Sequence, residues 1–144
     1  MKKIFAVAIA FLLCFSLCSC SSEKTVTVKV EIDCSEIIKN YDDLSDELKS
    51  EKYVPSNGII LEETSIEVKE GASAVDILKA ISKEYNIPID VSAGYAKSIN
   101  HISEKSCGEM SGWVYEINNE MYMDEYKAKD GDLITWKFVC SFDY

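Results

Sequence analysis

The sequence predicts an α+β fold, in which a β-grasp-like mixed sheet carries one main helix packed across it. Long strand patterns stand near both ends of the chain, at residues 25–34 and 133–140, with apolar residues at every second position. One clear amphipathic helix pattern lies between them, after Ser73. Since both end strands are long and have one apolar face, we expect them to lie at the centre of the sheet.

A leader precedes the predicted fold. Lys2 and Lys3 stand before an apolar run that is too short to span a bilayer as a helix. The residues that follow, Leu17-Cys18-Ser19-Cys20, resemble a bacterial lipobox, whose last cysteine receives lipid. We therefore expect residues 1–19 to be a lipoprotein signal peptide and Cys20 to be the lipid attachment site, which would hold the protein on the outer, extracytoplasmic face of the cell membrane. The alternative is an ordinary secretory peptide with incidental cysteines.

The rest of the chain has the length of one domain. Of 144 residues, 144 minus 19, or 125, follow the signal peptide. We expect residues 20–24 to form a short lipidated tether and residues 25–144 to form the domain. Lys+Arg is 15 and Asp+Glu is 25, so loss of the two leader lysines gives a formal charge of 13 minus 25, or −12. Such an acidic surface disfavours nucleic acid as a partner.

The elements follow the first strand in order. Residues 36–51 have apolar residues at roughly helical spacing in interrupted runs, which predicts short helical pieces. Ser73 begins the main helix, because it is a good N-cap residue and Asp76 follows three positions later. The other predicted elements are a turn at 55–58, two short strands around 59–61 and 65–69, a helix stop at 86–88, a strand or extended loop at 95–102, a strand at 113–117, a hairpin turn at 118–119 and a turn at 129–132.

Three cysteines remain in the predicted domain besides Cys20, which allows one disulfide and one free thiol. Cys34 and Cys140 each end a strand, in phase with its apolar residues. If the two strands are parallel neighbours, we expect a disulfide between Cys34 and Cys140, with Cys107 as the free thiol. A zinc site is the weaker alternative, because the sequence has no Cys-x-x-Cys and His101 is its one histidine.

Residue patterns typical of enzymes are missing from the sequence. The lone His101 has no recognisable nucleophile motif around it. Acidic pairs such as Glu62-Glu63 are adjacent, so on a strand they face opposite ways and do not form an acid/base couple. Asp130-Gly131-Asp132 lacks the later ligands of a calcium loop. We therefore expect a protein that is not an enzyme, with no metal site and no required cofactor.

An ordered set of motifs resembles the DUF4430 family, which comprises mostly Gram-positive surface proteins and is related to the C-terminal domain of transcobalamin and intrinsic factor. The resemblance implies a β-grasp-like fold over almost all of residues 25–144 and cobalamin or another planar molecule as the candidate ligand. In the animal carriers this domain closes over cobalamin that a helical barrel mainly holds, and no part of this sequence resembles that barrel. The motifs are Val28–Cys34, Gly58–Leu61, Val68–Gly71 with Val75–Leu78, Cys107–Trp113, and Tyr126–Asp132 through Trp136.

Trp113 has two interpretations. It shares a strand face with Tyr115, which predicts that both rings fill the core beneath the helix. Alternatively Gly112, which has no side chain, lets a flat ligand approach the backbone next to the tryptophan. The predicted ligand-binding residues are Tyr95, Met110, Ser111, Gly112 and Trp113, and Tyr122 and Tyr126 could extend their surface.

Two functions follow from these patterns. The first is a lipid-anchored extracytoplasmic binding module, which captures a small planar ligand such as cobalamin or another corrinoid and passes it to a transporter for uptake. The second is a non-enzymatic surface module with a structural or adhesive role, which contacts a protein or a cell-wall glycan. An apolar cleft beside Trp113 favours the first function, and a flat, filled surface there favours the second.

Overall fold

The structure is a computed structural model, and it describes residues 23–121 and 125–141. The predicted signal peptide, Cys20 and most of the tether lie outside these residues, as does Tyr122, so the lipid anchor stays a prediction from sequence.

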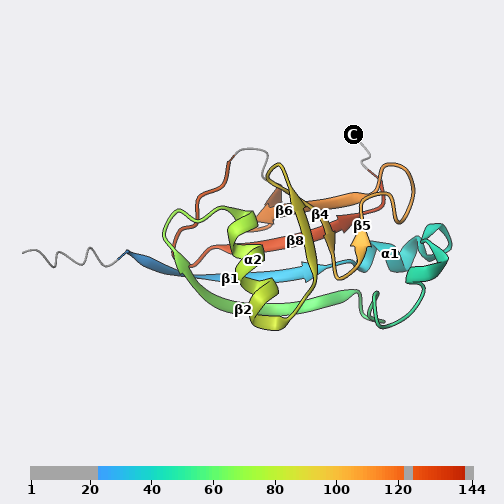
Figure 1. Cartoon of the computed structure of the whole chain (residues 1–144), viewed down its shortest axis with the longest axis horizontal. Coiled ribbons are helices and arrows are strands. Elements are labelled where there is room, and N and C mark those ends of the chain that lie inside the picture. The colour runs from blue at the N-terminus through green and yellow to red at the C-terminus, as the bar shows by residue number, and fades with distance from the viewer. Residues whose placement is uncertain (1–22, 122–124, 142–144) are drawn as a thin grey trace, which may run out of the picture.

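The predicted α+β fold with a mixed sheet is confirmed. The larger sheet has five strands in the order β2-β1-β8-β6-β7 (Figure 1). β1 and β8 lie near its centre, as the sequence predicts; they are parallel neighbours, and the other neighbouring pairs are antiparallel. The strands are β1 (Thr25–Asp33), β2 (Ile59–Lys69), β6 (Gly112–Ile117), β7 (Glu120–Met121) and β8 (Leu133–Val139).

The main helix and a small second sheet cover one face of the larger sheet. The helix α2 (Ala74–Tyr85) begins at the predicted N-cap, where Ser73 and Asp76 form a capping box, and it ends at Asn86 in the left-handed conformation. The second sheet has three strands in the order β3-β4-β5, namely β3 (Ile89–Ser92), β4 (Tyr95–Ile99) and β5 (Ile102–Ser103). Figure 1 shows α2 and β4 on the same side of the larger sheet.

Short helices connect β1 to β2, which confirms the helical pieces predicted for residues 36–51. They are α1 (Ser35–Lys39) and two 3-10 helices, η1 (Tyr41–Asp43) and η2 (Asp46–Leu48). Among residues 23–121 and 125–141, every helix is too short or too polar to cross a membrane.

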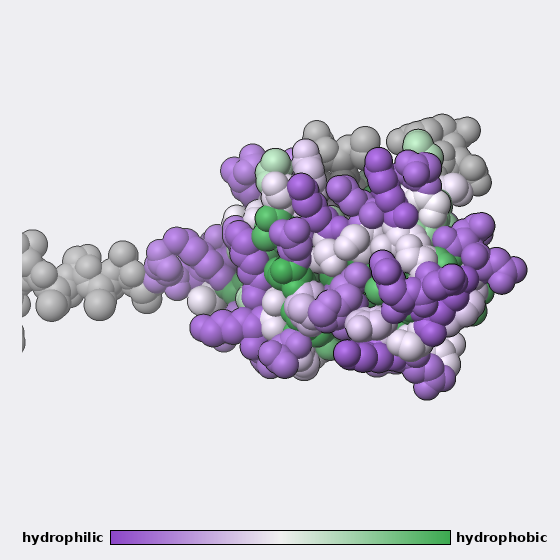
Figure 2. Space-filling model, turned by 45° about the vertical axis from the view of Figure 1, so that its right-hand side comes forward, coloured by the Kyte–Doolittle hydropathy of each residue, from purple (hydrophilic) through white to green (hydrophobic). Residues whose placement is uncertain are grey.

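The core lies between α2 and the larger sheet. Along β1, Val26, Val28, Val30 and Ile32 are buried, while the residues between them are exposed or half-buried. This alternation leaves the other face of the sheet in contact with water. Hydrophilic residues predominate on the molecular face that Figure 2 draws, in keeping with the acidic composition.

The prediction differs from the structure at two strands, β2 and β3. The two short strands expected in residues 59–69 are one strand, β2, with a bulge: Leu61 pairs with Ile32 and Thr64 with Val30, so β2 has one more residue than β1 between these pairs. The strand β3 was not predicted at all. Its four residues are too short to show a clear alternation, and they follow a proline that the sequence marks as a helix stop.

Candidate functional site

Trp113 lies in the core. Its side chain is 8% exposed, and its ring packs edge-on against Phe138, with ring centres 5.2 Å apart. The indole N–H donates a hydrogen bond to the carbonyl oxygen of Ile102 at 2.7 Å. The ring and its polar atom both have partners inside the protein, so among the described residues Trp113 is a core residue rather than the wall of a ligand site.

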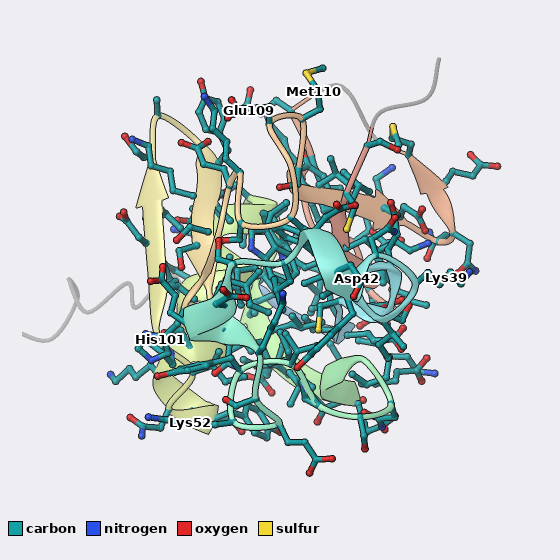
Figure 3. All side chains as sticks on the ribbon, turned by 90° about the vertical axis from the view of Figure 1, so that its right-hand side faces the viewer. Lys39, Asp42, Lys52, His101, Glu109 and Met110 are labelled. Atoms are coloured by element: carbon teal, nitrogen blue, oxygen red, sulfur yellow. The ribbon has the colours of Figure 1, made fainter. Side chains whose placement is uncertain are left out.

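The loop before β6 is held by its own hydrogen bonds. Ser111 is buried; its hydroxyl donates to the carbonyl oxygen of Gly108 at 2.8 Å and accepts from the backbone N–H of Cys107 at 3.0 Å. Met110 is 61% exposed at the tip of this loop and points outward in Figure 3. A Cβ atom at Gly112 would meet no heavy atom within 4 Å. Gly112 itself is buried, so its backbone gives a ligand little access.

Tyr95 belongs to a different part of the surface. It is 59% exposed and follows Gly94 at the tip of the β3–β4 hairpin. Gly94 lines a hollow together with Tyr115, which is three residues into β6, whereas Met110 precedes that strand. Neither Tyr95 nor the other four predicted residues line this hollow. Their ligand-binding role stays a prediction, and the hollow beside Gly94 is the better-formed candidate site.

We call this feature the α2 hollow. It has a volume of about 380 Å³, within the range of small-molecule sites. Four separate segments form it: the start of α2, the β3–β4 hairpin, β6, and the arm that leads into β8. Its lining residues are Ser73, Ala74, Val75, Gly94, Tyr115, Glu125 and Tyr126.

The capping box fixes the helical wall of the α2 hollow. The hydroxyl of Ser73 accepts a hydrogen bond from the backbone N–H of Asp76 at 3.1 Å and donates one to the Asp76 carboxylate at 2.8 Å. The hydrogen bonds from Ser73 hold the pKa of Asp76 below its usual value, although burial opposes this. Asp76 therefore stays ionised at the positive end of the helix, where a carboxylate is stabilising.

Two tyrosines form the opposite wall. Tyr115 is half-buried, and its ring lies 5.2 Å from that of Trp136. Tyr126 is 4% exposed, and its hydroxyl donates to the Asp132 carboxylate at 2.7 Å. The burial of Tyr126 contradicts its predicted place on an exposed surface. Glu125, which is exposed, is the charged residue among the seven that line the hollow.

A second hollow of about 550 Å³ continues on the other side of Tyr126. It shares Glu125 and Tyr126 with the α2 hollow, so these two residues form the ridge between the two spaces. Its other lining residues include both acidic and basic side chains: Ile117, Asn118, Glu120, Met121, Lys127, Lys129 and Asp132. This charged lining is less suited to a planar apolar ligand than the tyrosines of the α2 hollow.

The predicted disulfide between Cys34 and Cys140 is wrong. The sulfur of Cys140 lies 2.8 Å from that of Cys107, and all three cysteines are buried and free. The inward strand phases are confirmed, and β1 and β8 are parallel neighbours. However, β1 ends at Asp33, which pairs with Lys137, and the chain turns into α1 at Cys34, whereas β8 continues to Val139 before Cys140.

The described residues give no support to a metal site. Among residues 23–121 and 125–141, His, Cys, Asp and Glu side chains nowhere gather in a group of three that could hold an ion. His101 lies at the β4–β5 turn, and its ring meets the edge of Tyr53 with ring centres 5.3 Å apart (Figure 3).

Sequence reasoning missed most of the α2 hollow. Tyr115 was assigned to the core, and Ser73 was considered only as a helix cap. Glu125 carried no signal, because it belongs to no recognisable motif. The one usable signal was Gly94 between two short apolar runs, a weak indication of a hairpin turn that would have placed Gly94 at a strand end.

Comparison with known proteins agrees with this fold. The solved structure of haptocorrin in complex with Cbi, that is, cobinamide, is similar to this chain with a TM-score of 0.57 and 9% sequence identity. The similarity covers 83% of this chain but only 26% of the haptocorrin chain, and at this identity it shows the fold alone. No curated protein matched the sequence. The family model "Domain of unknown function (DUF4430)" matches residues 71–139, just under half of the chain, in agreement with the resemblance seen in the sequence motifs.

Proposed function

We propose that this protein is a lipid-anchored extracytoplasmic binding module that captures a small planar ligand at the α2 hollow, and that corrinoids are the first ligand class to test. The observation that carries the proposal is the hollow itself: a space of about 380 Å³ with tyrosines on one wall and a helix start on the other. The choice of corrinoids rests on the cobinamide that haptocorrin, a protein of similar fold, holds in its crystal structure.

The size of the α2 hollow limits how such a ligand would bind. A corrinoid is larger than a space of about 380 Å³, so the hollow would take one edge of the ring system and leave the rest outside. The exposed Tyr95, next to Gly94, is placed to contact the outer part. Burial of only part of a ligand yields modest affinity, so we expect a dissociation constant in the micromolar range rather than the nanomolar range, about −8 kcal/mol or weaker.

The charge of the site limits which planar ligands it favours. Glu125 places a carboxylate at the mouth of the α2 hollow, and the whole chain has a formal charge of −10. A neutral or cationic planar ligand is therefore favoured over one that carries carboxylates. We expect cobinamide to bind more tightly than haem, whose two carboxylates meet an acidic surface.

Calorimetric titration of the purified chain with cobinamide, cobalamin, haem and soluble glycans tests this proposal. Glu125→Lys should weaken cobinamide binding and strengthen haem binding, each by about two- to fivefold, as expected for one exposed charge. The matched control is Glu84→Lys, which makes the same charge change near the other end of α2 and should alter neither affinity. Equal effects of the two variants, or no corrinoid binding at all, would reject a corrinoid site in the α2 hollow.

The location is tested separately. Because Leu17–Cys20 resembles a lipobox, Cys20→Ala should release the protein from the membrane fraction or leave its precursor uncleaved. Mass spectrometry of the wild-type protein should find a diacylglyceryl group on an N-terminal Cys20. An unmodified N-terminus at another residue would contradict the anchor and leave the ligand proposal standing on its own test.

The surface around Trp113 keeps the alternative function open. Trp113 is buried rather than offered to a cleft, which favours a non-enzymatic structural or adhesive module that contacts a protein or a cell-wall glycan. Large apolar side chains are also exposed at several separate places: Ile38, Tyr41, Tyr85, Tyr95, Met110 and Met121. Retention of the protein on isolated cell wall, lost in Tyr95→Ala or Met110→Ala but kept in Glu125→Lys, would support this function over ligand capture.

A further inference from the structure

We propose that Cys107 and Cys140 form the disulfide of this protein and that Cys34 stays a free thiol. The two sulfur atoms lie 2.8 Å apart in the thiol form, so a shift of about 0.8 Å closes the bond. Neither cysteine belongs to the α2 hollow. The pairing goes beyond the ligand and the anchor proposed above and depends on neither.

Backbone contacts hold Cys107 in place. Its N–H donates to the hydroxyl of Ser111, and its thiol donates to the carbonyl oxygen of Asn40 at 3.5 Å. A backbone bridge also joins Cys107 to Leu44. The residue is 2% exposed, so its sulfur is enclosed on the loop side by the connection between β1 and β2.

Cys140 is held from the other side. It follows the last residue of β8, and its N–H donates to the Glu36 carboxylate on α1 at 2.8 Å. Gly108 lies close to the same residue, because a Cβ atom built there would stand 3.8 Å from the Cys140 carbonyl oxygen. Hydrogen bonds to the backbone of each cysteine therefore fix the positions from which the two sulfur atoms approach each other.

Cys34 does not fit as a partner of Cys140. β1 ends at Asp33, which pairs with Lys137, and the chain turns into α1 at Cys34, whereas β8 runs on for two more residues before Cys140; the Cys140 sulfur faces that of Cys107 instead. The backbone N–H of Cys34 also donates to the carbonyl oxygen of Gly58 at 2.7 Å, which holds the residue at the start of α1. Cys34 is fully buried, and burial raises its pKa to about 12, so its thiol is unreactive in the folded protein.

The oxidation needs an electron acceptor, and a low-molecular-weight disulfide such as oxidised glutathione supplies one. The Cys107 thiol loses its proton to solvent, and the thiolate attacks one glutathione sulfur and expels the other as a thiolate. The Cys140 thiolate then attacks the Cys107 sulfur of this mixed disulfide and releases the second glutathione. The protein loses two electrons and two protons, and the oxidant becomes two glutathione thiols.

Burial sets the time at which the bond forms. It raises the pKa of both Cys107 and Cys140, so few thiolates are present in the folded protein at neutral pH. We therefore expect the disulfide to close while the chain folds, and to close slowly when oxidised glutathione is added to protein that has folded in the reduced form.

A non-reducing peptide map tests the pairing. The full chain, with Cys14, Cys18 and Cys20 replaced by serine, is refolded in a glutathione redox buffer, and its free thiols are blocked with N-ethylmaleimide in denaturant. Trypsin cuts after lysine, so the three remaining cysteines fall on separate peptides, Val30–Lys39, Ser106–Lys127 and Phe138–Tyr144. We expect the second and third peptides to be linked and Cys34 to carry the blocking group. Cys34 in a disulfide, or three blocked cysteines, would overturn the proposal.

Melting temperatures give a second, independent readout. A reductant should lower the melting temperature of the refolded chain on the order of 10 °C, because the bond closes a long loop in the unfolded state. Cys34→Ala is the matched control and should keep this dependence on reductant, whereas Cys107→Ala and Cys140→Ala should lose it. The opposite pattern would overturn the proposal, and the peptide map decides if an alanine variant does not fold.

Discussion

Asp132 organises the arm that carries Tyr126. Its carboxylate accepts hydrogen bonds from the Tyr126 hydroxyl at 2.7 Å, the Asn118 side-chain amide at 3.0 Å and the Lys129 backbone N–H at 3.2 Å. Burial acts to raise the pKa of Asp132, but these hydrogen bonds to the charged form outweigh it, and the pKa lies below its usual value. The ionised carboxylate therefore stabilises the folded position of Tyr126 at the α2 hollow.

Replacement of this carboxylate gives a test with a defined pH dependence. Because the folded-state pKa of Asp132 is lowered, its contribution to stability is present above the unfolded pKa and is lost as the pH falls through the folded pKa. Asp132→Asn should lower the free energy of unfolding by about 2 kcal/mol at pH 7. Urea unfolding at several pH values should show the difference from wild type shrinking as the pH falls below about 4, the pKa of aspartate in an unfolded chain. The exposed Asp90→Asn is the control, and a difference that grows at low pH would contradict this role.

For single residues, the sequence predicted which side chains are buried better than it predicted which residues contact one another. The alternation that placed Trp113 and Cys140 on the inward face was right, because period-two patterns report which side of a strand is buried. The partner of Cys140 was wrong, because strand register depends on turns and bulges that lie elsewhere in the chain.

The β3–β4 hairpin is the element that sequence reasoning missed and that the α2 hollow needs. Its turn places Ala93 at φ 49° and Gly94 at φ 90°. Positive φ at both central residues is typical of a type I′ turn, for which Asn-Gly is the usual pair. Alanine is poorly suited to this conformation, so the hairpin has a weak sequence signal and a strained residue.

The strain at Ala93 predicts a stabilising substitution. Ala93→Asn should raise the free energy of unfolding by about 1 kcal/mol, because asparagine adopts the left-handed conformation more readily than alanine. The denaturant midpoint should increase with no change in the slope of the transition. Ala80→Asn, in the middle of α2, is the control and should lower stability through helix propensity. A loss of stability in Ala93→Asn would show that the turn is not strained.

At the scale of the whole molecule, the fold could be predicted from sequence and the candidate site could not. Two long amphipathic strands and one capped helix bury their apolar faces in few ways, and the central place of β1 and β8 follows from them. The α2 hollow is assembled from four segments spread over residues 73–126, and no local pattern marks their meeting. The family resemblance named a ligand class but placed it beside Trp113, where the structure is filled.

Hydrogen–deuterium exchange of the full chain, with and without saturating cobinamide, tests the central claim most directly. A ligand in the α2 hollow should slow exchange of backbone amides in three segments, residues 73–75, 93–95 and 125–126, because it shields them from water and damps their local opening. Exchange in residues 110–113 should be unchanged. Slower exchange in residues 110–113, with no change in residues 73–75, 93–95 and 125–126, would contradict the proposed site. It would place the ligand at the loop beside Trp113 instead.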